Sequence, residues 1–140
     1  MTFVADAGPL VTLGNADDSR FLNVFRLIEQ EPGEVLVPAP VTAEVDYLLD
    51  ARRGSGARAA FLDDLAAGRF RVVCLEPEEY ETVRRLNERY ADQNVGLADL
   101  SIVVIAHRFN TDRILTYDER HFRTLRPILG GSFTLLPGDV

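Results

Sequence analysis

The chain has 140 residues and is 46% hydrophobic, enough apolar material for one folded domain with its own core. Its formal net charge is −7 and its fifteen basic residues are all arginine, which excludes nucleic-acid coating by bulk positive charge and any catalytic lysine. A single cysteine excludes an internal disulfide framework and a zinc site built from cysteines.

No targeting or membrane segment is expected. The apolar runs fall well short of the roughly 18–20 residues that cross a bilayer. The first residues, MTFVADAG, have neither the basic region nor the long apolar segment of a signal peptide. We therefore expect a cytoplasmic protein with no membrane association.

The N-terminal half predicts two strands and three main helices. In chain order these are strand 2–6, helix 17–29, strand 35–38, helix 42–53 and helix 57–68. The strands are short apolar runs, whereas the helices carry apolar residues three or four positions apart. Thr42 is the expected N-cap of its helix, because a threonine oxygen accepts hydrogen bonds from the first turn.

The C-terminal half continues the alternation. Its elements are strand 70–75, helix 77–94, helix 97–106, strand 112–118 and strand 132–137. Cys74 lies in the apolar run FRVVCL and is expected to fill the core rather than act as a nucleophile. Strands separated by helices indicate an α/β fold, a parallel sheet of about five strands flanked by helices. With no linker or repeat, a single domain spanning 1–140 is expected.

Four carboxylates fall at corresponding places in these elements. Asp6 ends the first strand and Asp118 ends the fourth. Asp99 begins the apolar helix, and Glu44 is expected in the first turn of the helix that follows the second strand. Strand ends and the starts of the following helices share one edge of a parallel sheet, where ligands bind. The four acids are therefore expected to meet there.

Their convergence would be electrostatically unfavourable. Two like charges about 4 Å apart cost on the order of 4 kcal/mol at an effective dielectric of 20. The helix dipole gives an acid in a first turn only about 0.3–1 kcal/mol. A divalent cation can offset the repulsion, and oxygen ligands favour Mg²⁺ or Mn²⁺ over zinc. Taken singly, each acid is more simply a helix cap or a surface group; together they predict a metal site.

The acids lie within four motifs, VADAG, VTAEVDYLL, GLADLSIVVIA and ILTYDERHF. In order and spacing these resemble the acidic motifs of PIN domains and, more narrowly, of the VapC toxins of bacterial VapBC toxin–antitoxin modules. The resemblance implies a PIN-like sheet and a Mg²⁺-dependent endoribonuclease, with Mn²⁺ as the alternative ion. Its substrate would be structured RNA, either transfer RNA or a ribosomal RNA loop, cleaved by metal-activated water. The implied partners are a VapB-like antitoxin and a second copy of the chain.

The resemblance also implies roles for individual residues. The catalytic acids are Asp6, Glu44, Asp99 and Asp118, with Asp6 and Asp99 as metal ligands. Thr116 resembles the hydroxyl residue that supports the site in this family. His121, three residues after Asp118, is assigned a structural role, because metal-activated water needs no histidine base.

Contacts with the phosphates of RNA must come from local arginines. Removing the four acids from the net charge of −7 leaves −3, so the remaining surface is not basic either. The candidates flank the second and fourth motifs: Arg52, Arg53, Arg58, Arg120 and Arg123.

Three other functions share part of this acidic pattern. A HAD-type phosphatase needs a second aspartate two residues after the first, where this chain has Gly8, and usually a lysine. A response-regulator receiver also needs a lysine. A PIN-like module that binds RNA or protein without cleaving it stays open as an alternative, although four intact acids argue against it.

Overall fold

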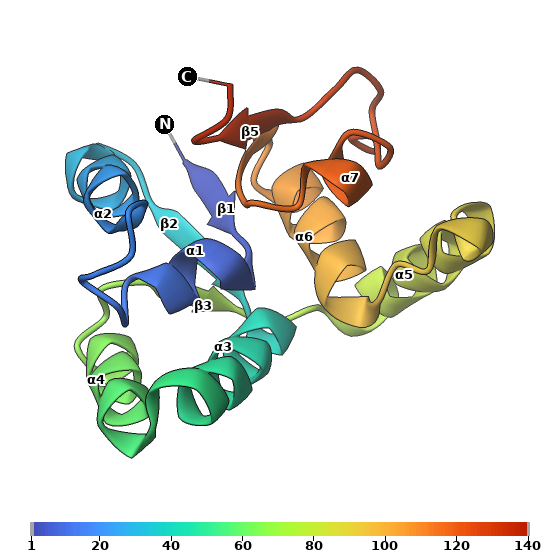
Figure 1. Ribbon diagram of the computed structural model, residues 1–140. Coiled ribbons are helices and arrows are strands. Elements are labelled where there is room, and N and C mark those ends of the chain that lie inside the picture. The colour runs from blue at the N-terminus through green and yellow to red at the C-terminus, as the bar shows by residue number, and fades with distance from the viewer. Residues whose placement is uncertain (1, 140) are drawn as a thin grey trace.

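The computed structural model describes residues 2–139, which contain one sheet of five parallel strands. The strands are β1 Phe3–Ala5, β2 Val35–Pro38, β3 Arg71–Val73, β4 Arg113–Leu115 and β5 Thr134–Leu136. Their order is β3-β2-β1-β4-β5, so the first strand of the chain lies at the centre of the sheet (Figure 1). The predicted α/β class and the five predicted strands are confirmed, each strand lying within its expected range.

Seven helices surround this sheet in the described part of the chain. They are α1 Ala7–Thr12, α2 Phe21–Gln30, α3 Ala39–Arg53, α4 Ser55–Ala66, α5 Pro77–Arg89, α6 Leu97–Arg108 and α7 Glu119–Phe122, with a 3₁₀ turn, η1, at Ala91–Gln93. Helices α3 and α4 pack against each other, while α5 packs on α6 and extends away from the sheet (Figure 1). Within residues 2–139, no helix combines the length and apolarity needed to cross a bilayer.

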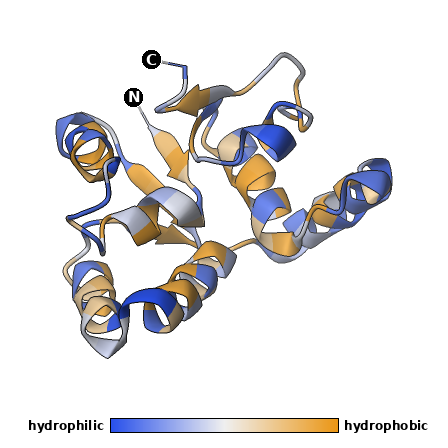
Figure 2. Cartoon of the chain, viewed as in Figure 1, coloured by the Kyte–Doolittle hydropathy of each residue, from blue (hydrophilic) through white to orange (hydrophobic). Residues whose placement is uncertain are grey.

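The core is formed by the strands and by α6. All three residues of β1 are fully buried, as expected for a parallel strand covered on both faces. Helix α6 packs across β1, β2 and β4 and is buried along its length from Leu100 to Ala106. Figure 2 shows the strands and much of α6 as hydrophobic, whereas the outlying helices carry polar faces. A helix that is apolar all round belongs in an interior, and α6 lies there.

Helix α3 begins earlier than the sequence predicted. It starts at Ala39, with Pro38 as its N-cap and Pro40 in the first turn. Proline suits a first turn because its missing N–H would have no helical partner there. The expectation that Thr42 caps the helix is therefore wrong, and its hydroxyl donates instead to the Ala39 carbonyl at 2.6 Å. Glu44 accordingly lies in the second turn of α3, not in the first.

Cys74 is exposed, so its predicted burial is also wrong. Strand β3 ends at Val73 and forms the edge of the sheet. On this edge only alternate side chains face the core, and Val73 and Leu75 are the buried ones. Cys74 points between them to solvent.

Helix α7 is one turn long and depends on packing for its position. A helix of one turn has too few internal hydrogen bonds to be stable alone. Its anchor is Phe122, which is 1% exposed and meets Phe133 edge to face, with ring centroids 6.2 Å apart. This contact packs the turn that begins at Asp118 against the segment that leads into β5.

Replacing Phe122 by alanine is expected to lower the free energy of unfolding by about 3–5 kcal/mol, the usual cost of a large aromatic cavity. Urea denaturation followed by circular dichroism measures the change. The matched control is Leu129→Ala, because Leu129 is 83% exposed, and its effect should stay within about 0.5 kcal/mol. Similar values for the two variants would show that Phe122 does not anchor α7.

Candidate active site

Asp6 occupies the carboxyl end of the central strand. Its Oδ1 accepts a hydrogen bond from the Ala7 N–H at 2.8 Å, which caps α1. Its Oδ2 accepts a hydrogen bond from the Thr116 hydroxyl at 2.7 Å. Burial raises the pKa of this carboxyl, which is 8% exposed, and the two hydrogen bonds act in the opposite direction. Asp6 is thus buried and oriented, with its charge only partly compensated.

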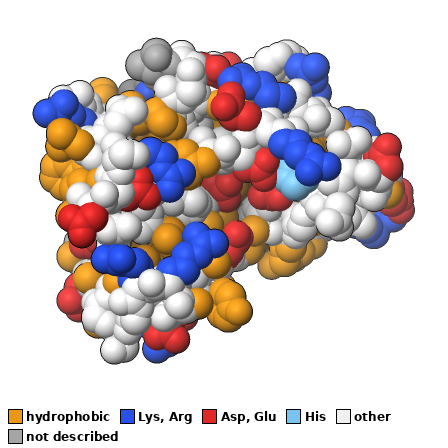
Figure 3. Space-filling model, in the orientation of Figure 1, with side chains coloured by type: hydrophobic (Ala, Val, Ile, Leu, Met, Phe, Trp, Pro, Cys, Tyr) orange, Lys and Arg blue, Asp and Glu red, His pale blue; other side chains and the backbone are white. Residues whose placement is uncertain are grey.

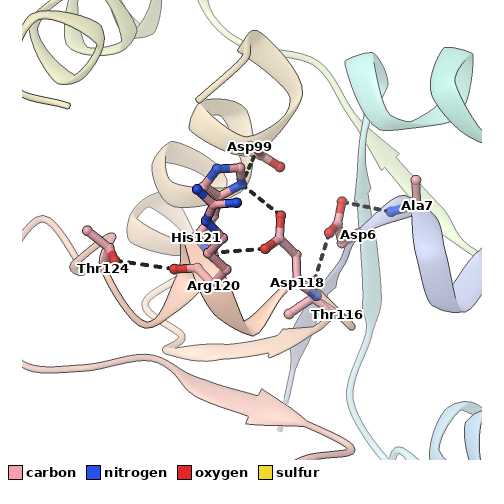
Figure 4. A network of polar contacts seen from close by, with 8 residues as sticks. All are labelled: Asp6, Ala7, Asp99, Thr116, Asp118, Arg120, His121 and Thr124. Carbon is pink, nitrogen blue, oxygen red and sulfur yellow. Dashed lines mark hydrogen bonds and ion pairs between the residues drawn. The ribbon is translucent and has the colours of Figure 1, made fainter. Parts of the chain in front are cut away.

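Thr116 connects Asp6 to Asp118. Thr116 follows β4, the strand paired with β1, and is 2% exposed. Its Oγ1 accepts a hydrogen bond from the Asp118 N–H at 2.9 Å while it donates to Asp6. The sequence assigned Thr116 a supporting role in the site, and the structure places it in contact with both acids (Figure 4).

Asp118 is the N-cap of α7 and contacts His121 twice. Its Oδ1 accepts a hydrogen bond from the His121 backbone N–H at 3.0 Å. Its Oδ2 lies 2.8 Å from the Nδ1 atom of the His121 ring. The same Nδ1 lies 3.8 Å from Oδ2 of Asp99, so the imidazole stands between two carboxylates (Figure 4).

Asp99 lies in the first turn of α6 and is half-buried. Its pKa is raised to about 7, first by burial and then by the negative charges of Asp6 and Asp118. Glu44, the most exposed of the four acids, has its pKa raised by burial and by the charge of Asp6. Each of these acids therefore lies within electrostatic reach of another.

All four acids line one cleft of about 460 Å³, together with Arg52, Tyr117 and His121. Figure 3 shows acidic side chains gathered in a hollow between α1 and α7, with a histidine and basic groups at its rim. The predicted meeting of Asp6, Glu44, Asp99 and Asp118 at one edge of the sheet is thus observed.

The donor set suits a hard divalent cation. Asp99, Asp118 and His121 each offer a ligand atom, and these atoms all lie within 4.8 Å of one another. Carboxylate oxygens are the ligands that Mg²⁺ and Mn²⁺ prefer. Burial first, and then the negative charges of Asp6 and Asp118, raise the pKa of Asp99. A cation bound among these oxygens would offset those negative charges.

The candidate RNA-binding arginines are placed differently from one another. Arg52 lines the cleft. Arg53 is exposed on α3, and Arg120, also exposed, precedes His121 at the rim. Arg58 is bound to Asp46 at 2.6 Å, and Arg123 is paired with Glu119 and Asp139. Arg52 therefore has the best position to meet a ligand in the cleft.

Two features beside the cleft were not predicted from the sequence. The guanidinium carbon of Arg20 lies 4.1 Å from the centre of the Tyr117 ring, held there by Asp18 through bonds of 3.0 and 2.8 Å. Gly8 leaves room for that ring, because a Cβ atom there would lie 2.9 Å from Tyr117 Cδ2. Nothing local in the sequence links positions this far apart.

We expect Asp99→Asn to stabilise the metal-free protein at alkaline pH. The pKa of Asp99 is about 7 in the folded chain, against a reference value of 3.8. The folded state thus favours the protonated acid, and ionisation destabilises the fold increasingly as the pH rises from about 4 to about 7. In EDTA at pH 8 the variant should gain about 1–2 kcal/mol, less than the full pKa difference because solvent screens the site.

Urea denaturation at pH 4 and pH 8 tests this, and the gain should vanish at pH 4. Asp63→Asn, which removes an exposed acid on α4, is the matched control. Added Mg²⁺ should stabilise the wild type and not Asp99→Asn. A gain of the same size at both pH values would contradict the electrostatic explanation.

Comparison with known proteins identifies the family of this chain. The model of the PIN domain family matches residues 3–126. Ribonuclease VapC26 of Mycobacterium tuberculosis is 37% identical over 134 residues, which cover 96% of this chain and 99% of that protein.

Two solved structures have a similar fold. VapC20 from Mycobacterium tuberculosis, described as a sarcin–ricin loop cleaving toxin, has a TM-score of 0.72 at 21% identity, covering 80% of this chain and 86% of its own. VapBC2 from Rickettsia felis, bound to a DNA fragment from its promoter, has a TM-score of 0.70 at 16% identity, covering 96% of this chain and 97% of its own. At these identities the two structures support the fold alone. The family match and the 37% identical relative show that this chain belongs to the PIN-domain family, among the VapC ribonucleases.

Proposed function

We propose that this protein is the toxin of a VapBC-type toxin–antitoxin module and a metal-dependent endoribonuclease. Its catalytic acids would be Asp6, Glu44, Asp99 and Asp118. The observation that carries the proposal is their meeting in one cleft from four separate segments, with the pKa of Asp99 raised to about 7. A cluster of mutually repelling acids costs stability, and such perturbed groups are typical of functional sites.

Asp6 and Asp99 would hold the ion, assisted by Asp118, with Mg²⁺ as the proposed species and Mn²⁺ as the alternative. A divalent ion at such a site lowers the pKa of water and offsets charge on the scissile phosphate. The chain's own groups provide the orientation: the Thr116 hydroxyl fixes Asp6 Oδ2, and the Thr116–Asp118 contact fixes the turn that carries Asp118. Glu44, at the exposed rim of the cleft, would accept a proton at its carboxylate.

The substrate is proposed to be structured RNA, a transfer RNA or a ribosomal RNA loop. VapC20, with its similar fold, is described as cleaving the sarcin–ricin loop, and a looped RNA is proposed here by analogy with it. Arg52 in the cleft, with Arg53 and Arg120 near it, would contact phosphates. Such a role would place the protein in the cytoplasm, where these RNAs function.

The proposed partners are a VapB-like antitoxin and a second copy of this chain. VapBC2 of Rickettsia felis, which this fold resembles, supports the first. The antitoxin would present a basic group to the acidic cleft, because a cation there relieves the same repulsion as a metal ion does. We also propose that the PIN domain extends over residues 1–140, since β5 lies beyond residue 126 and completes the sheet.

RNA cleavage in Mg²⁺ tests the proposal. Asp6→Asn and Asp99→Asn should each reduce cleavage of a labelled RNA by about 100-fold or more, because each removes a charged oxygen from the metal site. Asp63→Asn, on the outer surface of α4, should cleave like the wild type. EDTA should abolish wild-type cleavage.

If both site variants cleave as fast as the wild type, the metal mechanism is wrong and a contaminating nuclease is responsible. If the pure wild type binds RNA in Mg²⁺ without cleaving it, the non-catalytic binding module is the better description. Mapping new RNA 5′ ends after induced expression would identify the substrate.

A second prediction concerns Arg52. In a Glu44→Gln background, which keeps the proposed metal ligands Asp6 and Asp99 and should leave RNA intact, Arg52→Ala should weaken RNA binding uniformly across sequences and reduce the salt slope by about 0.7–1. Fluorescence anisotropy at several salt concentrations measures both effects. The control is Arg84→Ala on α5, where the arginine is paired with Glu81 and Glu88 away from the cleft. Equal effects of the two changes would show that Arg52 is not part of the RNA-binding surface.

A further inference from the structure

The imidazole of His121 lies beside two of the acids in the cleft. Its Nδ1 atom lies 2.8 Å from Asp118 Oδ2 and 3.8 Å from Asp99 Oδ2. The ring lines the same cleft as the four acids and is half-buried. Figure 4 shows it pointing toward Asp99 and Asp118.

The three side chains lie close enough together to share one ion. Ligand atoms about 2.1 Å from an octahedral ion lie about 3 Å apart when adjacent and about 4 Å apart when opposite. The 2.8 and 3.8 Å separations are close to these two values. One ligand atom from each of the three side chains lies within 4.8 Å of the other two. Small side-chain adjustments would therefore bring all three atoms onto one ion.

The backbone holds His121 in this orientation. Asp118 and His121 are three residues apart on the single turn of α7, so their side chains face the same way. The His121 N–H donates to Asp118 Oδ1, and the neighbouring Phe122 anchors the turn in the core. The ring is thus presented to the acids by a fixed turn and not by a free loop.

We propose that His121 is a metal ligand alongside Asp99 and Asp118 and that it shifts the preference of the site from Mg²⁺ toward Mn²⁺. Mg²⁺ takes oxygen ligands, whereas imidazole nitrogen binds first-row transition ions. Among those ions, Mn²⁺ is the one that a carboxylate-rich site also suits. The inference rests on the metal site of the proposed function and specifies its ligands and its ion.

The experiment measures metal binding by the intact protein without RNA. Pulsed electron paramagnetic resonance of bound Mn²⁺ should show coupling to a ¹⁴N nucleus in the wild type and none in His121→Asn. Calorimetric titration should show Mn²⁺ affinity about tenfold weaker in His121→Asn, with Mg²⁺ affinity within about threefold of the wild type.

The substitutions separate ligation from positioning. Asparagine can keep a hydrogen-bond donor toward Asp118 but has no imidazole nitrogen, whereas His121→Leu removes both. His107→Asn, at the exposed far end of α6, is the matched control and should change neither affinity. Thermal unfolding in EDTA checks that each variant folds, and the wild-type spectrum is informative without any variant.

Mn²⁺ bound to the wild type without nitrogen coupling would overturn the inference and leave the proposed function intact. So would equal losses of both ions in His121→Leu that His121→Asn restores, because that pattern assigns His121 to positioning Asp118. Failure of the wild type to bind either ion would overturn the metal site of the proposed function as well.

Discussion

The pairing of β1 with β4 is the constraint on which the site depends. The two strands run parallel with Ala5 opposite Leu115, so the next residues, Asp6 and Thr116, emerge together at the carboxyl edge. The Asp6 N–H extends the strand pairing by donating to the Leu115 carbonyl at 2.8 Å. The Thr116 hydroxyl donates to the Asp6 carboxylate. Because neighbouring strand residues face opposite sides, a slip of one position would turn the carboxylate away from the hydroxyl.

The packing of the rest of the molecule holds four mutually repelling carboxylates close together. Asp99 stands at the head of α6, the helix most deeply embedded in the core, so its carboxylate cannot retreat without moving apolar contacts across three strands. Buried packing of this kind contributes far more than the few kcal/mol lost to like charges. The fold can therefore hold the acids in place before any ion arrives, which is the preorganisation that metal-assisted chemistry needs.

The sequence predicted the sheet and the convergence of the acids because both follow from local patterns. Apolar runs mark the strands, and acids just beyond them, such as Asp6, must share an edge once the strands are parallel. Properties that depend on tertiary position were missed. Cys74 is exposed because β3 is an edge strand of the sheet. Glu44 lies in the second turn because α3 begins at Ala39, with Pro40 in its first turn. The rotamer that turns His121 toward the acids leaves no sequence signal.

The excess negative charge of the cleft connects the proposed ion, substrate and antitoxin. The chain carries a net charge of −7, and its cleft concentrates four of the acids. RNA would be repelled from this surface unless a divalent ion occupies the cleft, so ion and phosphate should bind cooperatively. A basic antitoxin group that reaches the same acids would relieve the same repulsion and displace the ion. Inhibition of this kind needs no change in the fold, because it competes for charges that the parallel strands have already brought together.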